Sequence, residues 1–318
     1  MAFMGLTVRD ALGTLGQTST SRLARVTYFG ELADLQTAYV PDHTLATGAI
    51  VSWLGDRFDG WRGNVFNDTT KILTATIPGR YLVLDFAGPR RYIGGFYGLT
   101  IVNSNNEVVI DNRNRNLEIV ASGTANITTS QAPFYINYPQ VDAPLVFIQM
   151  PNDVWIYVGT IGATQAIVSC EGTASFNYFV AGFRINSVAA PSGQYALSMK
   201  DNAGRTIFAS NRAYARIPGS YWTTYPNITY TGNQDDTRFD MQPAPAGAYT
   251  CIGTCSSKPD TIDTDFGLPV AKATVGGVDY FRIQRKAIDP FKRQALGLNF
   301  YSGASAQTQI FSLVGFPY

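Results

Sequence analysis

The segment GLTVRDALGTLGQTSTSRLARV (residues 5–26) recurs along the chain and decides how the remaining sequence is interpreted. Its second copy is YGLTIVNSNNEVVIDNRNRNLEIV (residues 97–120), and its third copy is YALSMKDNAGRTIFASNRAYARI (residues 195–217). A fourth start, GLNFYSGASAQTQIFSL, begins at residue 297, so successive starts at residues 5, 98, 196 and 297 lie 93, 98 and 101 residues apart. Self-similarity at a nearly constant period indicates a repeated structural unit.

Each copy has the pattern of a β-hairpin. In the second copy, LTIV and EVVI flank NSNN, and asparagine tolerates the backbone angles of a tight turn. In the third copy, LSMK and RTIF flank DNAG, in which Gly204 can supply a positive φ. The first copy contains ALGTLGQ, which has two glycines and little β-branching, so we expect an irregular or edge hairpin there.

An aromatic strand precedes each later copy: RYLVLDF around Tyr81, FNYFVAGF around Tyr178 and VDYFRIQ around Tyr280. Other short apolar runs end at Gly, Pro or Asn, and only ELADLQTAYV (residues 31–40) has a helix-like composition. The sequence therefore predicts an all-β chain with little helix, built from tandem small antiparallel β-sandwich or barrel-like domains.

The predicted domains cover residues 1–97, 98–195 and 196–296, and residues 297–318 form a closing hairpin or C-terminal strand that completes the third domain. No Pro-rich or Ser/Gly-rich linker separates these segments. If the opening hairpin of each domain completes the sheet of the domain before it, the domains dock rigidly.

Composition argues against several classes of function. The formal net charge is +1, and charged residues make up 15% of the chain, below the ~25% of an average globular protein. This excludes strong electrostatic attraction to nucleic acid or to an anionic membrane. The N-terminal MAFMGLTVRD has no signal-peptide pattern, and no run of residues is long and apolar enough for a membrane span. We expect a soluble protein made in the cytosol, with no nucleic-acid partner and no membrane insertion.

The chain offers few groups for catalysis or metal binding. The only histidine, His43, has no nucleophile motif beside it. Cys170, Cys251 and Cys255 predict reduced structural thiols, although CIGTC could instead close a small disulfide loop or supply half of a metal site. Acidic clusters that could form a cation site or a glycan-hydrolase acid pair are Asp56 and Asp59, then Asp235, Asp236 and Asp240, then Asp260, Asp263 and Asp265. Their Gly, Thr and Asn neighbours favour solvated turns, so we predict no catalytic residue, no metal and no cofactor.

Aromatic side chains in polar segments are the candidate contact residues. They occur in GDRFDGWRGNVF (residues 55–66) and in SYWTTYPNITYTGNQDD (residues 220–236), neither of which has the pattern of a core strand. Amphipathic rings beside Asn, Asp and Thr suit protein interfaces or stacking on sugars, and packing within their own domain is the alternative. The residues concerned are Trp61, Tyr221, Trp222, Tyr225 and Tyr230.

The repeated motif resembles the opening motif of small β-rich tail proteins of tailed bacteriophages. In those proteins a Gly-Leu-x-Val strand leads to an Asp or Asn turn and then to an Arg-x-x-Arg-Val-like strand, as in residues 5–26. The resemblance covers about a quarter of the chain and implies a virion protein: a minor tail, tail-tip or tail-fibre protein. Its implied partners are other tail proteins and further copies of itself, in a trimer or a ring. A tail adaptor is a further structural role that we expect to fit. The alternatives are a receptor-binding protein that grips a host surface glycan with aromatic loops and, ranked third, a glycan hydrolase.

Overall fold

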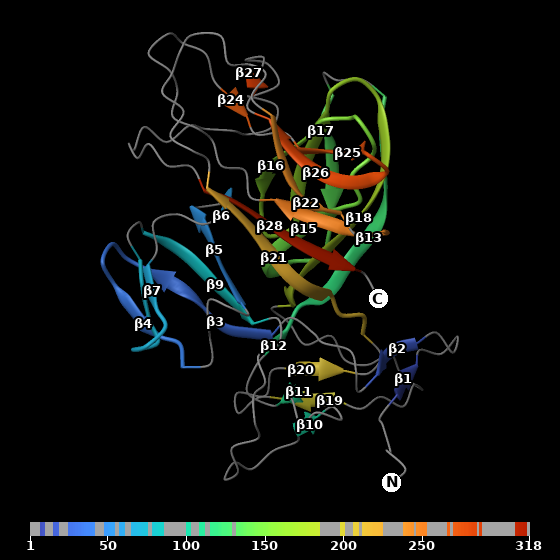
Figure 1. Ribbon diagram of the computed structural model, residues 1–318. Coiled ribbons are helices and arrows are strands. Elements are labelled where there is room, and N and C mark those ends of the chain that lie inside the picture. The colour runs from blue at the N-terminus through green and yellow to red at the C-terminus, as the bar shows by residue number, and fades with distance from the viewer. Residues whose placement is uncertain are drawn as a thin grey trace.

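A computed structural model of the chain describes residues 7–9, 15–18, 25–41, 48–54, 57–60, 65–75, 78–85, 100–102, 108–111, 115–128, 132–184, 198–200, 206–209, 212–224, 238–244, 246–252, 266–267, 270–284, 286–287 and 309–316. Within these ranges the backbone forms antiparallel sheets and no helix (Figure 1). The predicted all-β class with little helix is confirmed.

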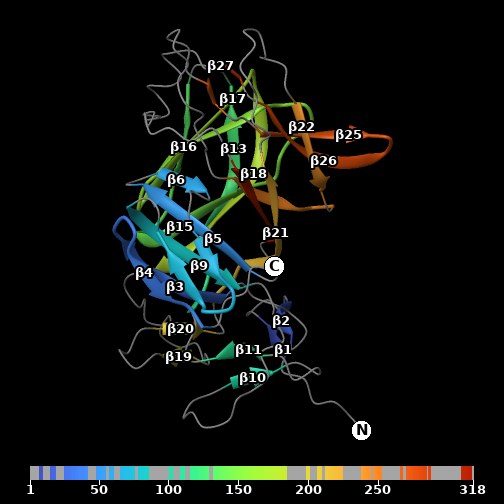
Figure 2. The same cartoon turned by 60° about the vertical axis from the view of Figure 1, so that its left-hand side comes forward.

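All three predicted hairpins form, each as a separate two-stranded sheet. They have the same register: Thr7 pairs with Thr18, Thr100 with Asp111 and Ser198 with Ala209. In each hairpin the register shifts between the second and third residues of the first strand. The first hairpin is irregular, as expected, but the other two hairpins have the same irregularity. The three hairpins lie together at one end of the molecule in both views (Figures 1 and 2). Their strands are β1 (Thr7–Arg9) and β2 (Leu15–Thr18), β10 (Thr100–Val102) and β11 (Val108–Asp111), and β19 (Ser198–Lys200) and β20 (Thr206–Ala209).

After each hairpin the chain forms a two-sheet sandwich, and the strand order is the same each time. In sandwich 1 (residues 25–85) one sheet contains the order β3-β9-β5, extended at β5 by β6 (Arg57–Gly60), and the other has the order β4-β8-β7. Its strands are β3 (Arg25–Leu32), β4 (Thr37–Tyr39), β5 (Gly48–Leu54), β7 (Val65–Asn67), β8 (Ile72–Thr74) and β9 (Gly79–Asp85).

Sandwich 2 (residues 118–184) repeats this arrangement with the orders β13-β18-β15 and β14-β17-β16. If the six strands of a sandwich are numbered along the chain, the order across one sheet is first, sixth, third. The order across the other sheet is second, fifth, fourth. This is the strand order of a jelly roll with fewer strands than usual. The strands are β13 (Glu118–Ile127), β14 (Phe134–Asn137), β15 (Val141–Ile148), β16 (Ile156–Ile161), β17 (Gln165–Cys170) and β18 (Ala174–Arg184).

Sandwich 3 (residues 216–316) has the orders β21-β28-β23 and β22-β26-β25 and continues both sheets of sandwich 2 edge to edge. The joins are single pairings, Ile148 with Thr250 between β15 and β23, and Ile156 with Val270 between β16 and β25. The short strands β24 (Phe266–Gly267) and β27 (Lys286–Ala287) pair with each other. The main strands are β21 (Arg216–Thr224), β22 (Arg238–Pro243), β23 (Tyr249–Ile252), β25 (Val270–Val275), β26 (Val278–Gln284) and β28 (Gln309–Phe316).

The aromatic strand around Tyr280 is not the counterpart of those around Tyr81 and Tyr178. Tyr81 and Tyr178 lie in β9 and β18, the last strands of their sandwiches, whereas Tyr280 lies in β26, whose counterparts are β8 and β17. The C-terminal strand β28 takes the place of β9 and β18 by pairing with both β21 and β23. The positions of the predicted domain boundaries stay a prediction.

The window at residues 31–40, the best helix candidate in the sequence, is not a helix. It contains the end of β3, a turn and all of β4. Leu35 has a φ of 58°, in the left-handed region, which is incompatible with a right-handed helix. The backbone N–H groups of Leu35 and Val40 donate to the carbonyls of Ala75 and Lys71, both at 2.8 Å. Long-range pairing with the β8 region therefore overrides the local preference.

The sheet of sandwich 1 that contains β9 is buried on both faces. Tyr81 and Val83 lie in a core with residues of β4, β7 and β8, between the two sheets of sandwich 1. The alternate residues Leu82 and Leu84 lie in the larger core, which is shared with sandwiches 2 and 3. Because successive side chains of a strand point to opposite faces, burial on both faces explains the unbroken apolar run YLVL.

The first residues of the three sandwiches meet at one junction. Strand β12 (Arg115–Asn116) pairs with Val26 and Arg25 of β3. Immediately afterwards, the Ile119 N–H donates to the Ala213 carbonyl at 2.8 Å, so the same segment reaches the chain that leads into sandwich 3. It is β12, and not the preceding hairpin, that joins the sheet of sandwich 1, which corrects the expectation that a hairpin completes it. The sandwiches are thus tied together at their beginnings.

Candidate interaction surfaces

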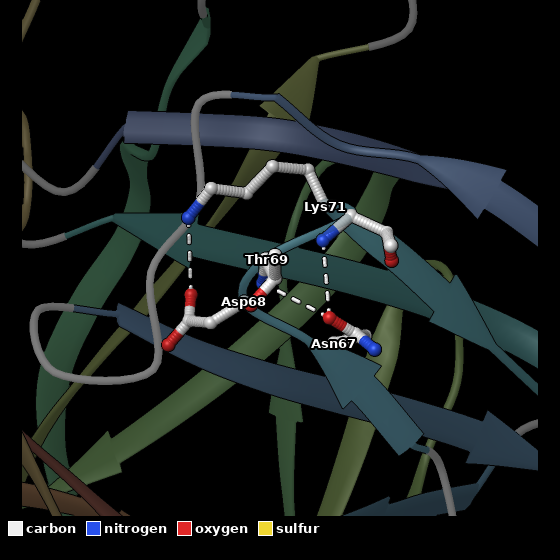
Figure 3. Close-up of polar contacts among 5 residues, drawn as sticks. Asn67, Asp68, Thr69 and Lys71 are labelled. Carbon is white, nitrogen blue, oxygen red and sulfur yellow. Dashed lines mark hydrogen bonds and ion pairs between the residues drawn. The ribbon is translucent and has the colours of Figure 1, made fainter.

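The turn between β7 and β8 is held by the side chain of Asn67 (Figure 3). Its Oδ1 accepts hydrogen bonds from the backbone N–H groups of Thr69 at 2.9 Å and Thr70 at 3.0 Å. The Lys71 ammonium donates to Asp68 Oδ1 at 3.1 Å, and the Lys71 backbone has a φ of 59°. An Asn side chain that bonds the backbone ahead of it is a common device for fixing a turn. The start of β8 is therefore held in place.

Large apolar side chains are exposed beside this turn. Tyr39 of β4 and Ile72 of β8 are directly opposite each other, and they are 70% and 36% exposed. The strand neighbours of these two residues, Ala38 and Leu73, point inward, as the alternation of a strand requires. We call Tyr39 and Ile72 the outer patch of sandwich 1. Leu35, which is 72% exposed, lies at the other end of β8, where its N–H donates to the Ala75 carbonyl.

A second exposed apolar pair lies at the turn between β25 and β26, which projects from the body in Figure 2. Val275 and Val278 pair across the turn and are 45% and 41% exposed. The two residues between them are glycines with φ values of 59° and 82°, the conformation that a two-residue hairpin turn needs.

Polar side chains brace the same hairpin near its tip. Thr274 Oγ1 donates to Asp279 Oδ1 at 2.7 Å, and Lys272 Nζ lies 3.0 Å from Asp279 Oδ2. The hydrogen bonds from Thr274 and Lys272 lower the pKa of Asp279. The carboxylate is therefore ionised at neutral pH and holds the two strands together.

The aromatic residues predicted from the sequence are only partly placed. Trp61, Tyr225 and Tyr230 lie outside the described residues. Tyr221 and Trp222 lie in β21, where their backbones pair with Ser312 and Phe311 of β28. The expectation that these two residues sit in a loop is therefore wrong, because their strand is one edge of a six-stranded sheet.

The predicted reactive groups are largely outside the described ranges. His43, Asp56, Asp235, Asp236, Cys255 and the acidic run at residues 260–265 are not described, and Asp59 and Asp240 lie in β6 and β22. Cys170 and Cys251 are buried and neither forms a disulfide, so Cys251 is not in the small disulfide loop that CIGTC allowed. Burial raises the pKa of Cys251 well above its ordinary value. Among the described residues, no group of three or more His, Cys, Asp or Glu side chains could hold a metal ion.

Two buried ionic contacts between described residues lie at the junction of the sandwiches. Arg25 of β3 contacts Asp85 of β9 at 2.5 Å, with both side chains under 5% exposed. Nearby, Arg212 bonds Glu118 at 2.9 Å, and Tyr214 accepts a hydrogen bond from the Ala209 N–H at 2.7 Å. Burial raises the pKa of Tyr214. The two ion pairs align the beginnings of the sandwiches, because each joins segments far apart in the sequence, whereas the Ala209–Tyr214 bond is local.

Neither the outer patch of sandwich 1 nor the exposed pair Val275 and Val278 was found from the sequence. Tyr39 lies in the window that looked helical, and Val275 lies in a run interpreted only as a strand. The pattern VGGV carries a usable signal, since Gly-Gly between β-branched residues predicts a tight hairpin with side chains at its tip. The sequence has no comparable signal for the outer patch, because the exposure of a side chain depends on which other strands pack over its face of the sheet.

No protein-family model, curated protein or solved structure matches the chain. The described part of the chain has no helix long and apolar enough to cross a membrane.

Proposed function

We propose that this protein is a non-enzymatic structural component of a bacteriophage tail, at the tip, in a fibre or as an adaptor. It assembles as a symmetric oligomer with other tail proteins and supports host adsorption. The observation that carries the proposal is the threefold repetition of one hairpin and one sandwich in a single chain. The resemblance of the repeated motif to phage tail proteins supplies the biological setting.

The way the repeats are joined supports a mechanical role. Sandwiches 2 and 3 share both of their sheets, and sandwich 1 contributes Val26, Leu82 and Leu84 to the core of the other two. Shared sheets and a shared apolar core resist hinge motion between repeats, because bending would expose buried apolar surface. A rigid body of this kind suits a protein that transmits force or holds a fixed geometry in a particle.

A second candidate function is binding of a host surface glycan. Tyr39 favours it, because a ring 70% exposed on a sheet beside the exposed Thr37 offers a stacking face next to a polar group. The two functions are compatible, because one chain can present an assembly surface and a glycan-binding surface on different faces.

The structural role is tested by locating the chain in purified particles of the virus that encodes it. A gold-labelled antibody raised against the recombinant full chain is expected to decorate the tail in electron micrographs. If the chain is missing from purified particles in which the other virion proteins are detected, the structural proposal is wrong.

Glycan binding is tested separately with the isolated protein. Tyr39→Ala is expected to weaken binding of the full chain to host envelopes, whereas Tyr135→Ala, at another exposed tyrosine (48%), leaves it unchanged. Trp222→Ala and Tyr225→Ala test the residues chosen from the sequence. If wild-type protein does not bind host envelopes, or if Tyr39→Ala, Trp222→Ala and Tyr225→Ala all bind as well as wild type, glycan recognition by these rings is refuted.

A further inference from the structure

Most edge strands of the described sheets have a feature that blocks pairing with another chain. Strands β4, β7, β12 and β14 contain four residues or fewer, as do the strands of the separate two-stranded sheets. β6 carries Arg57 and Asp59 in four residues. β21 and β22 are longer, but each contains at least one charged residue and a proline, Pro218 and Pro243. Short length, charge, proline and bulges are the usual means by which proteins protect sheet edges.

Strand β13 is the exception. It has 10 residues and forms the edge of a six-stranded sheet. Its only charged residue, Glu118, is at the beginning and is paired with Arg212. After the irregularity at residues 119–121, the strand runs in regular register with β18 as far as Ile127. Residues 121–127, with the sequence ASGTANI, contain no charge and no proline, and we call them the β13 edge.

The β13 edge is open to solvent. Ser122, Gly123, Thr124 and Asn126 are all exposed, whereas Ala125 and Ile127 point into the core. Within the described residues, the backbone of the β13 edge is paired on one side only, with β18. A row of backbone N–H and C=O groups is therefore presented outward, and in isolation these groups bond to water.

The β13 edge is also held in an extended conformation. On the outer face, Thr124 donates to Asn177 at 2.8 Å, and Asn177 donates to Gln149 at 3.0 Å, so hydrogen-bonded side chains connect β13, β18 and the residue that follows β15. On the other face, the Tyr178 ring covers Gly123, where a Cβ would lie 3.0 Å from the Tyr178 hydroxyl. An aromatic ring over an edge glycine and a polar ladder both stabilise the strand, so little ordering is needed before it pairs.

From these contacts we infer that the β13 edge pairs antiparallel with the β13 edge of a second copy of this chain, across a twofold axis. The inference rests on the oligomeric assembly in the proposed function and names the surface that forms it. The midpoint of the edge, Thr124, then lies opposite the partner's Thr124, and Ser122 lies opposite the partner's Asn126. Hydroxyl and amide groups at these positions can hydrogen-bond across the strands.

Self-pairing fits the chemistry of this edge better than pairing with a charged strand. A twofold contact places each residue against a copy of the same surface, so any charge near the axis would repel itself. The β13 edge carries none. The chain already uses the same mode internally, because β15 and β23 join two equivalent sheets at their edges. Pairing of β13 would extend one six-stranded sheet into a continuous sheet through two molecules.

The test is sedimentation velocity of the full-length chain from micromolar to about 1 mM, with Thr124→Lys as the perturbation. Two lysines would face each other at the axis, and like charges directly opposite destabilise strand pairing. We expect the dimer dissociation constant to rise about tenfold or more. Thr37→Lys on β4, a three-residue edge strand, is the matched control and leaves the dimer unchanged. Ser122→Lys gives a second variant at an exposed position of the same edge.

Hydrogen exchange locates the contact independently. Amides of residues 121–127 are expected to exchange more slowly at high protein concentration than at low concentration, and this difference disappears in Thr124→Lys. Wild-type protein that stays monomeric at 1 mM, or an oligomer that Thr124→Lys and Ser122→Lys leave intact, overturns the inference. An intact oligomer in these variants would refute the β13 contact but not the proposed tail function. Absence of the chain from purified particles would refute the tail function but not the β13 contact.

Discussion

The buried pair of Arg25 and Asp85 allows a quantitative test of how the junction is stabilised. We expect Asp85→Asn to lower the free energy of unfolding by about 3–5 kcal/mol, because the Arg25 guanidinium would stay buried without its counter-charge. Both side chains are under 5% exposed, and the two contacting atoms are 2.5 Å apart. The Arg25 Nη1 atom has no hydrogen-bond partner, so the guanidinium is already incompletely hydrogen-bonded in the wild-type protein.

The double variant Arg25→Met/Asp85→Leu separates the charge effect from packing. Replacing a buried ion pair by apolar residues of similar size is often neutral or stabilising, by about 1–4 kcal/mol. Removal of Arg25 also removes a buried donor without a partner, which by itself costs about 1–3 kcal/mol in the wild-type protein. We therefore expect the double variant to be at least as stable as the wild type, although each single substitution is costly.

Urea unfolding followed by circular dichroism measures the global effect, and native-state hydrogen exchange of β3 and β9 amides measures the local effect. Asp68→Asn is the matched control, because Asp68 makes an ion pair with Lys71 at 3.1 Å but is 45% exposed. An exposed pair of this kind contributes under about 1 kcal/mol. If Asp85→Asn costs no more than Asp68→Asn, or if the two substitutions at the buried pair are simply additive, the reasoning is refuted.

Three further outcomes are expected. Asn67→Ala removes the acceptor for two turn amides and should destabilise the β7–β8 turn by about 0.5–1.5 kcal/mol, measured by local hydrogen exchange, whereas Asn67→Asp should be close to wild type. Because its hydrogen bonds lower the pKa of Asp279, the contacts of this carboxylate are complete above its ordinary pKa and are lost as pH falls through the lowered value. Amide chemical shifts of residues 272–279 followed by NMR should report that loss at acid pH, and unchanged shifts there would contradict it. Cys170 and Cys251 are buried, so neither should react with a thiol reagent in the native protein at pH 8, and both should react in denaturant; rapid native labelling of either would show that the core is open.

Strand-forming segments and hairpins could be predicted from the sequence because they depend on local chemistry. Alternating and β-branched residues flanked by Asn, Asp and Gly specify a hairpin within about a dozen residues, and all three copies form at the predicted positions. The all-β class follows from the same local signals. Even the first copy, with its poorer pattern, has the same register as the others.

Long-range relationships could not be predicted in this way. Residues 31–40 have helix-like composition, yet Leu35 and its neighbours bond to Ala75 and Lys71, far along the chain. The strand at Tyr280 has the aromatic alternation of those at Tyr81 and Tyr178 but occupies a different place in its sandwich. The alternation of apolar and polar residues indicates that one face of a strand is buried, but it does not indicate which strand lies beside it.

The same distinction holds for the candidate surfaces. Composition determined that the chain is poor in charge and rich in aromatic residues, and periodicity determined that one strand-rich unit is repeated. Only the tertiary structure decided that Tyr39 is exposed, that Tyr221 and Trp222 belong to an edge strand, and that β13 ends a sheet without protection. Local propensities act over a few residues, whereas exposure is set by the strands and sheets that pack on each face, and these come from distant parts of the chain.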